Sequence, residues 1–201
     1  MTIEISASLD PAVGKNLEGY LQELNNLEYI SIHCDIMRSD FVTRNSVNAE
    51  QYLYILKNSK HPVDVHIMAN SIELELRKAL KNHPPRSLSV HIESQLTKEY
   101  NSGLVIDLDT ENLDGELIKS AKVITVMSVK AGASGQKFNS SALEKIKIIK
   151  NLNKFARIIL DGGINSENIA QVKNAGVDTA VVGSYLYNTH DKKATLELLQ
   201  G

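Results

Sequence analysis

Two histidines and two aspartates lie near the ends of extended, mostly apolar stretches of this sequence. His33 and Asp35 are two residues apart in one such stretch, so an extended chain places both side chains on the same face. His66 lies in a second stretch, and Asp161 ends a third. Imidazole and carboxylate groups together suit a divalent metal ion or acid–base catalysis. A single histidine of this kind is more simply explained as a hydrogen-bonded interior residue, but the set of four favours a site for chemistry.

The three internal methionines also occur at the ends of extended stretches, at Met37, Met68 and Met127. Methionine commonly fills irregular gaps in a core. Around polar groups it would also form an apolar lining that keeps water away from a reactive intermediate. The two interpretations are compatible.

Short extended stretches alternate with amphipathic helical stretches along the whole sequence. We expect strands near residues 3–8, 29–37, 62–69, 87–94, 103–109, 122–129, 157–162 and 179–184. We expect helices near residues 15–26, 49–58, 71–83, 111–120, 140–154, 165–175 and 190–200. Eight strands alternating with helices predict parallel pairing and, if the units close on themselves, a (β/α)8 TIM barrel. The length of 201 residues predicts one domain, 1–201.

An open, doubly wound sheet is the alternative architecture, but its central strands are apolar on both faces. Here one face is repeatedly polar, as in residues 88–93, where serine, histidine and glutamate alternate with leucine, valine and isoleucine. That alternation suits a barrel interior. Only residues 95–102 separate the fourth and fifth strands, which is about two helical turns at most. We therefore expect the fourth helix to be shortened or absent.

Three glycine-containing turns follow the last three strands, at 130–136, 161–165 and 182–184. Glycine lets backbone N–H groups approach an anion closely, and helix N-termini favour negative charge. Each of these segments alone is more often a simple turn. Three of them at the same end of one barrel predict a phosphate-binding site.

The composition excludes several classes of protein. The net charge is −2, and with no basic bias a nucleic-acid partner is not expected. No apolar run approaches the roughly 20 residues of a membrane span, and the N-terminus enters a strand without a signal-peptide pattern. Cys34 is the only cysteine, so neither an intrachain disulfide nor a zinc finger is expected. These features predict a cytoplasmic protein with no membrane partner.

The ordered series of motifs resembles the ribulose-phosphate 3-epimerase family over nearly the whole chain. The motifs are Ser8, His33-x-Asp35-x-Met37, Val63-Asp64-Val65-His66-x-Met68, Val126-Met127-Ser128-Val129, Gly132-x-x-Gly135-Gln136-x-Phe138, Asp161-Gly162-Gly163-Ile164 and Gly183-Ser184. Single motifs recur elsewhere, but the ordered series is specific. The resemblance implies an isomerase that interconverts D-ribulose 5-phosphate and D-xylulose 5-phosphate through an enediolate.

The resemblance also implies roles for particular residues. One divalent ion, Zn2+, Fe2+, Mn2+ or Co2+, would be held by His33, Asp35, His66 and Asp161. Asp35 and Asp161 would also be the acid–base pair, and Ser8, His66 and Asp161 would contact the sugar. The substrate phosphate would lie on Gly132, Ala133, Ser134, Gly135, Gly162, Gly163, Gly183 and Ser184. Met37, Met68 and Met127 would line the site around a small phosphorylated sugar. Family members commonly form dimers or hexamers, so a homo-oligomer is expected by analogy.

Two segments depart from the family pattern. Arg38-Ser39 stands where the family usually has an Asp-Gly turn, and loop 130–136 lacks the usual proline and has Ala133 in place of an aromatic lid residue. These changes leave the four expected ligands intact but bear on substrate identity, turnover and loop closure. Arg38 either attracts a phosphosugar to the mouth of the site or is simply a solvated surface residue, and we favour the second interpretation.

Three alternative functions remain compatible with the sequence. The same chemistry could act on a longer ketose phosphate such as allulose 6-phosphate. The altered turn and loop are compatible with a phosphosugar-binding protein of weak or no catalysis. The third alternative is a metal-free barrel enzyme, such as a phosphate-handling lyase or isomerase.

Overall fold

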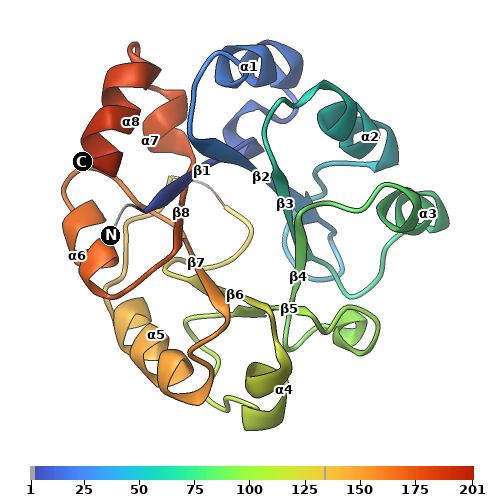
Figure 1. Cartoon of the computed structure of the whole chain (residues 1–201). Coiled ribbons are helices and arrows are strands. Elements are labelled where there is room, and N and C mark those ends of the chain that lie inside the picture. Colours follow the sequence, from blue (N-terminus) through green and yellow to red (C-terminus); the bar gives the residue numbers. More distant parts are fainter. Residues whose placement is uncertain (1–2, 134) are drawn as a thin grey trace.

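Eight parallel strands form one closed barrel in the computed structural model of this chain, which describes residues 3–133 and 135–201. The strands are β1 (Glu4–Ser8), β2 (Ile30–Met37), β3 (Val63–Met68), β4 (Ser87–His91), β5 (Gly103–Ile106), β6 (Val123–Met127), β7 (Arg157–Asp161) and β8 (Thr179–Val182). They pair in sequence order, and β8 closes the ring by pairing with β1. Figure 1 shows the strands at the centre and the helices around them. The predicted (β/α)8 barrel is confirmed.

The helices cover the outside of the barrel and mostly follow one strand each. They are α1 (Leu17–Leu24), α2 (Ala49–Asn58), α3 (Leu74–Asn82), α4 (Gly115–Ser120), α5 (Ser141–Leu152), α6 (Ile169–Asn174), α7 (Ser184–Tyr187) and α8 (Lys192–Gln200), with short 3-10 turns η1 (Asp10–Ala12) and η2 (Gln95–Lys98). The sequence did not predict α7, which begins where the eighth strand was expected to continue. Within the described ranges, none of the helices has the length and apolar character needed to cross a membrane.

The unit between β4 and β5 contains η2 in place of a full helix, as the short connection predicts. Ser94 caps the start of η2, because its Oγ accepts a hydrogen bond from the Leu96 N–H, and the same Oγ donates one to the Ala69 carbonyl oxygen. Leu96 is buried and packs into the apolar layer that a longer helix would otherwise cover. The barrel therefore stays closed at this unit despite the missing helix.

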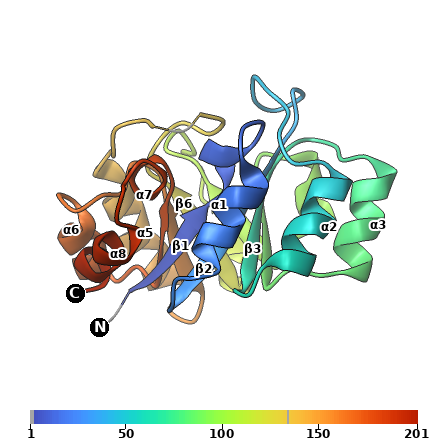
Figure 2. The same cartoon turned by 90° about the horizontal axis from the view of Figure 1, so that it is seen from above.

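Strand β2 shows how the alternating pattern positions the site. All eight of its residues are buried, because helices cover one face and the barrel interior encloses the other. Ile32 and Cys34 belong to the apolar layer between the strands and the helices. His33 and Asp35 have the opposite orientation and project into the barrel, as predicted. The loops after β2 and β6 rise from the carboxyl ends of the strands, opposite the edge where the two termini lie (Figure 2).

The amino end of the barrel is closed by a cluster of charged groups around Asp64. Arg86 Nε donates to one carboxylate oxygen of Asp64 at 3.0 Å, and Arg157 Nη2 donates to the other at 2.5 Å. Arg86 also forms two hydrogen bonds with Glu4, of 2.8 and 3.0 Å, and Ser87 Oγ donates to Asp64 at 2.6 Å. Burial raises the pKa of Asp64, but these hydrogen bonds outweigh it and lower the pKa to about 2.

We predict that Asp64→Asn lowers the free energy of unfolding at pH 7 by about 2 kcal/mol, because the pKa of the Asp64 carboxyl group falls from its ordinary value to about 2 on folding. The carboxylate's contribution is complete above the unfolded pKa and is lost as the pH falls through the folded pKa. Denaturant unfolding should therefore show a smaller difference between wild type and variant at pH 3 than at pH 7. Glu167→Gln, which changes an exposed carboxylate, is the matched control. An equal difference at both pH values would contradict the assignment.

Candidate active site

A cavity of about 550 Å³ lies at the carboxyl ends of the strands. It is lined by most of the predicted site residues: Ser8, Asp35, Met37, Met68, Met127, Gly132, Ala133, Gly135, Asp161, Gly162, Gly163, Gly183 and Ser184. His33 and His66 are almost completely buried and lie outside this lining. Ser134 lies outside the described residues. The structure therefore brings the three glycine turns, the methionines and the two aspartates to one cavity.

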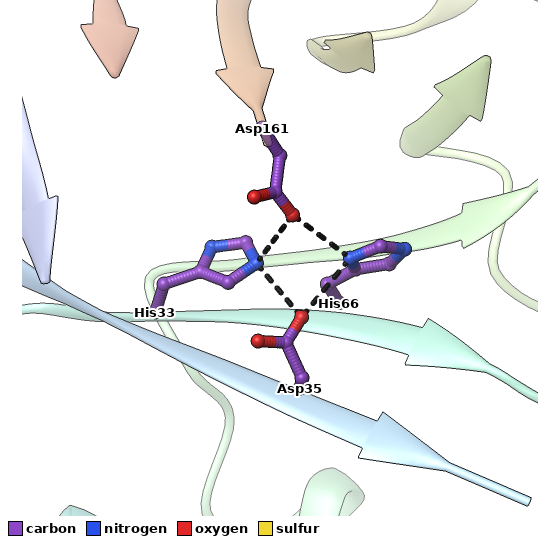
Figure 3. Close-up of side chains that lie close together, drawn as sticks. All are labelled: His33, Asp35, His66 and Asp161. Carbon is purple, nitrogen blue, oxygen red and sulfur yellow. Dashed lines mark hydrogen bonds and ion pairs between the residues drawn. The ribbon is translucent and has the colours of Figure 1, made fainter. Parts of the chain in front are cut away.

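His33, Asp35, His66 and Asp161 meet in the barrel interior (Figure 3). His33 Nε2 lies 3.1 Å from Asp35 Oδ1 and 3.5 Å from Asp161 Oδ2. His66 Nδ1 lies 3.2 and 3.5 Å from the same two oxygens. The two carboxylates approach from opposite sides, with an imidazole on each remaining side. Four potential ligand atoms thus surround one point.

Barrel register accounts for this convergence. Asp35 of β2 is the direct cross-strand neighbour of His66 of β3, and Met37 is the neighbour of Met68. Asp161 of β7 is paired in the same way with Met127 of β6. Because parallel strands end at the same edge, these pairs lie at one level of the barrel. Closure through β8 and β1 then brings Asp161 toward the β2–β3 pair.

The four-residue cluster fits a divalent metal ion. Tetrahedral ligands about 2.0–2.1 Å from an ion are separated from one another by roughly 3.3 Å. The four N–O separations of 3.1 to 3.5 Å agree with that spacing. His66 Nδ1 is buried and makes no hydrogen bond, although it faces both carboxylates. A nitrogen lone pair in such surroundings is suited to metal ligation, so the residues could hold an ion.

The charges of the four groups are strongly interdependent. Burial raises the pKa of the Asp35 and Asp161 carboxyl groups, but His33 and His66 outweigh it, so both pKa values fall below the usual range. For the two histidines the signs reverse, because burial lowers the pKa and the carboxylates raise it above its usual value. An atom that binds a metal ion must be deprotonated, so an ion has to displace protons from the imidazole nitrogens that face it.

Ser8 connects the first strand to the cluster. Its Oγ donates a hydrogen bond of 3.1 Å to Asp35 Oδ2, the oxygen of that carboxylate that faces away from the histidines. The same Oγ accepts a hydrogen bond from the Asp10 N–H at 3.2 Å. Ser8 therefore fixes the Asp35 carboxylate while lining the cavity.

The turn after β7 requires its two glycines. Gly162 and Gly163 have φ angles of +122° and +63°, a region that other residues rarely adopt. A Cβ atom at Gly163 would lie 2.4 Å from the Phe138 backbone nitrogen, and one at Gly162 would lie 2.5 Å from a Val129 methyl group. The turn thus packs tightly against the loop after β6, with its backbone beside the cavity.

Arg38 is buried, so our expectation that it is a solvated surface residue is wrong. Only 8% of the residue is exposed, and its guanidinium group forms two hydrogen bonds with the Glu73 carboxylate, of 2.8 and 2.7 Å. It also donates to the Met37 carbonyl oxygen at 2.6 Å. Arg38 therefore fastens the end of β2 to the start of α3, and it is not among the residues that line the cavity.

Asp10 and Arg44 are neighbours of the site that sequence reasoning missed. Asp10 lines the cavity and forms an ion pair with Arg44, whose Nε donates to the Gly132 carbonyl oxygen at 3.2 Å. Arg44 thereby connects the segments after β1, β2 and β6. The only sequence signal for Asp10 is its position two residues after Ser8, and no spacing pattern indicates Arg44.

Known proteins resemble this chain in sequence and in fold. The model of the ribulose-phosphate 3 epimerase family matches residues 4–187. Ribulose-phosphate 3-epimerase from Helicobacter pylori is 30% identical, covering 98% of this chain and 97% of its own length. The Aquifex aeolicus protein of the same name is 32% identical and covers 84% and 82%. A solved tryptophan synthase alpha-subunit from Pyrococcus furiosus, at 16% identity, has a TM-score of 0.66 over 98% of this chain and 94% of its own, which shows likeness of fold alone.

We predict that His33→Ala weakens divalent metal binding at least about 10-fold, because one of the four ligand atoms is removed. Metal content after dialysis and a Zn2+ titration of the metal-free protein measure the effect. Binding to the wild type should weaken as the pH falls, because the ion competes with protons on histidines of raised pKa. His190→Ala, at an exposed position, is the control. Full metal content in the His33 variant would remove this residue from the ligand set.

Proposed function

The chain belongs to the ribulose-phosphate 3 epimerase family and is an isomerase, and we propose that it interconverts D-ribulose 5-phosphate and D-xylulose 5-phosphate with a divalent metal ion. The observation that carries the proposal is the placement of two carboxylates on opposite sides of one point at the base of the cavity. The glycine turns on the cavity wall supply a second element, a backbone suited to a phosphate.

Asp35 and Asp161 form the acid–base pair in this proposal. Inversion of a carbon beside a ketone requires a base to remove its proton on one face and an acid to return a proton on the other. The two aspartates approach from opposite sides, and both line the cavity. One carboxylate takes the proton, and the other, carrying a proton, delivers it to the opposite face of the planar enediolate. Exchange of the two roles gives the reverse reaction.

His33, Asp35, His66 and Asp161 would hold the ion, which can be Zn2+, Fe2+, Mn2+ or Co2+. When bound, it supplies Lewis-acid stabilisation of the negative charge that develops on the substrate oxygens. We assign His66 to the ion in preference to the sugar. Its Nδ1 faces the two carboxylates and its Nε2 contacts His91, so neither ring nitrogen is free to face the cavity. Ser8, which lines the cavity, is the stronger candidate for a sugar contact.

The phosphate of the substrate would lie on the backbone of the three turns. Each turn contributes a glycine to the cavity wall, namely Gly135, Gly163 and Gly183. Ser184, which begins α7, also lines the cavity. Binding a phosphate remote from the reacting carbon orients the substrate without taking part in the chemistry. Met37, Met68 and Met127 line the space over the aspartates and would limit the access of water to the intermediate.

The proposed substrate is tested by comparing kcat/KM for D-ribulose 5-phosphate and allulose 6-phosphate with the metal-loaded protein. A higher value for ribulose 5-phosphate supports the proposal. A higher value for allulose 6-phosphate assigns the same chemistry to the longer sugar. No xylulose 5-phosphate above a protein-free reaction would rule out the proposed reaction.

We predict that Asp35→Asn and Asp161→Asn each lower kcat at least about 100-fold, because an amide cannot take or deliver the proton. Circular dichroism should show that both variants remain folded, and D-ribulose 5-phosphate turnover measures the effect. Asp109→Asn, an exposed change in the loop after β5, is the control and should leave kcat unchanged. Near wild-type turnover in either active-site variant would show that the pair is wrongly assigned.

A further inference from the structure

A line of polar side chains runs behind His66 across three neighbouring strands. His66 lies in β3, His91 ends β4, and Asp107 directly follows β5. His66 Nε2 is 2.8 Å from His91 Nε2, and His91 Nδ1 is 2.6 Å from Asp107 Oδ2. Both imidazoles are completely buried. None of these contacts is used in the reaction proposed above, so they require a separate explanation.

The direction of each hydrogen bond follows from the cluster around His66. A nitrogen that binds an ion offers a lone pair, so the proton of neutral His66 belongs on Nε2 when Nδ1 faces the ion. Nε2–H of His66 then donates to His91 Nε2. The proton of His91 must consequently be on Nδ1, where it donates to the Asp107 carboxylate. The two hydrogen bonds are mutually consistent and specify one tautomer for each ring.

The surroundings hold this line of groups in place. The His66 and His91 rings meet at their Nε2 edges, with centroids 5.0 Å apart and 29° between their planes. The Phe41 ring, on the loop after β2, has its centroid 4.8 Å from that of His91. Lys145 Nζ donates to the Asp107 carbonyl oxygen at 2.7 Å, and Thr110 Oγ1 accepts from the Asp107 N–H at 3.1 Å. The backbone of Asp107, at the far end of the line, is therefore anchored by groups from α5 and the loop after β5.

A second cation site is the competing explanation, because His91, Glu93 and Asp107 offer ligand atoms close to one another. Both ring nitrogens of His91 are already engaged, one by His66 and one by Asp107. Glu93 in turn accepts a hydrogen bond of 2.5 Å from Thr110 Oγ1. These contacts form a hydrogen-bonded network that ends at His66, one of the four residues of the proposed metal site.

We propose that His91 and Asp107 are positioning residues that fix the tautomer and orientation of His66 as a metal ligand. This inference rests on the metal site of the proposed function. Groups that hydrogen-bond to the far nitrogen of a ligating histidine set its ring orientation and increase its basicity, and their loss typically weakens metal binding about 10- to 100-fold. His91 would act through His66 and would not touch the substrate.

The test compares the Zn2+ affinities of metal-free variants by competition with a chromophoric chelator. We expect His91→Leu to bind Zn2+ about 10- to 100-fold more weakly than wild type, because it removes the acceptor for His66 Nε2–H. His91→Gln should show a smaller loss, since its amide oxygen can accept the same hydrogen bond. Asp107→Ala should weaken binding in the same direction, whereas Asp109→Ala, an exposed change, should not.

Val90→Ala is the matched control for loosening of β4, because Val90 is buried in the apolar layer on the other side of the strand. It should lower thermal stability without weakening Zn2+ binding. Wild-type affinity in His91→Leu, or an equal loss in Val90→Ala, would overturn the proposal. If wild type and His33→Ala bind Zn2+ alike, the metal site itself fails and the inference with it. If the wild type binds Zn2+ tightly, and His33→Ala weakens this binding but His91→Leu does not, the metal site stands and only the positioning role is contradicted.

A spectroscopic measurement decides the matter if His91→Leu fails to fold. Long-range proton–nitrogen NMR correlations of the Zn2+-loaded wild type identify which nitrogen of each histidine carries the proton. The proposal requires a proton on Nε2 of His66 and on Nδ1 of His91. A proton on Nδ1 of His66, or on Nε2 of His91, would contradict it.

Discussion

Two carboxylates that both remain ionised in a buried site need positive groups between them. Asp35 and Asp161 meet this condition because one oxygen of each faces both His33 and His66, at 3.1 to 3.5 Å. Without such partners a buried charge costs several kcal/mol. In the absence of an ion the imidazoles compensate the carboxylates, and a divalent ion at the same point would do so with greater charge. The chemistry proposed for the cavity depends on this balance.

The barrel makes that balance possible by fixing backbone positions around it. Neighbouring strands β2 and β3 place Asp35 directly beside His66, and closure of the ring brings β7 with Asp161. The charged cluster around Asp64 lies at the amino end of the barrel, and the cavity is lined by residues at the carboxyl ends of the strands and by the loops that follow them. A hydrogen bond from Ser8 then holds the Asp35 carboxylate, and a hydrogen bond with His91 holds the His66 ring. Rigid strands carry the reactive groups, and glycine turns supply the wall around them.

The sequence predicts those features that depend on periodicity and strand order. Alternation along 29–37 identified His33 and Asp35 as interior neighbours, and parallel strand ends predicted their meeting with His66 and Asp161. Features built from distant pairs were not predictable. The burial of Arg38 depends on Glu73, and the ion pair between Asp10 and Arg44 joins different loops, so neither leaves a local pattern. The helix α7 was missed because its four residues are too few for a helical period.

The most direct measurement is proton NMR of D-ribulose 5-phosphate in deuterated water with the metal-loaded protein, repeated after a chelator has removed the ion. The proposed site predicts loss of the C3 proton signal and formation of xylulose 5-phosphate carrying deuterium at C3. Both changes should stop in the chelated sample and return when Zn2+ or Fe2+ is restored. Absence of exchange with every metal would contradict the reaction, and undiminished exchange after complete metal removal would contradict the role of the ion.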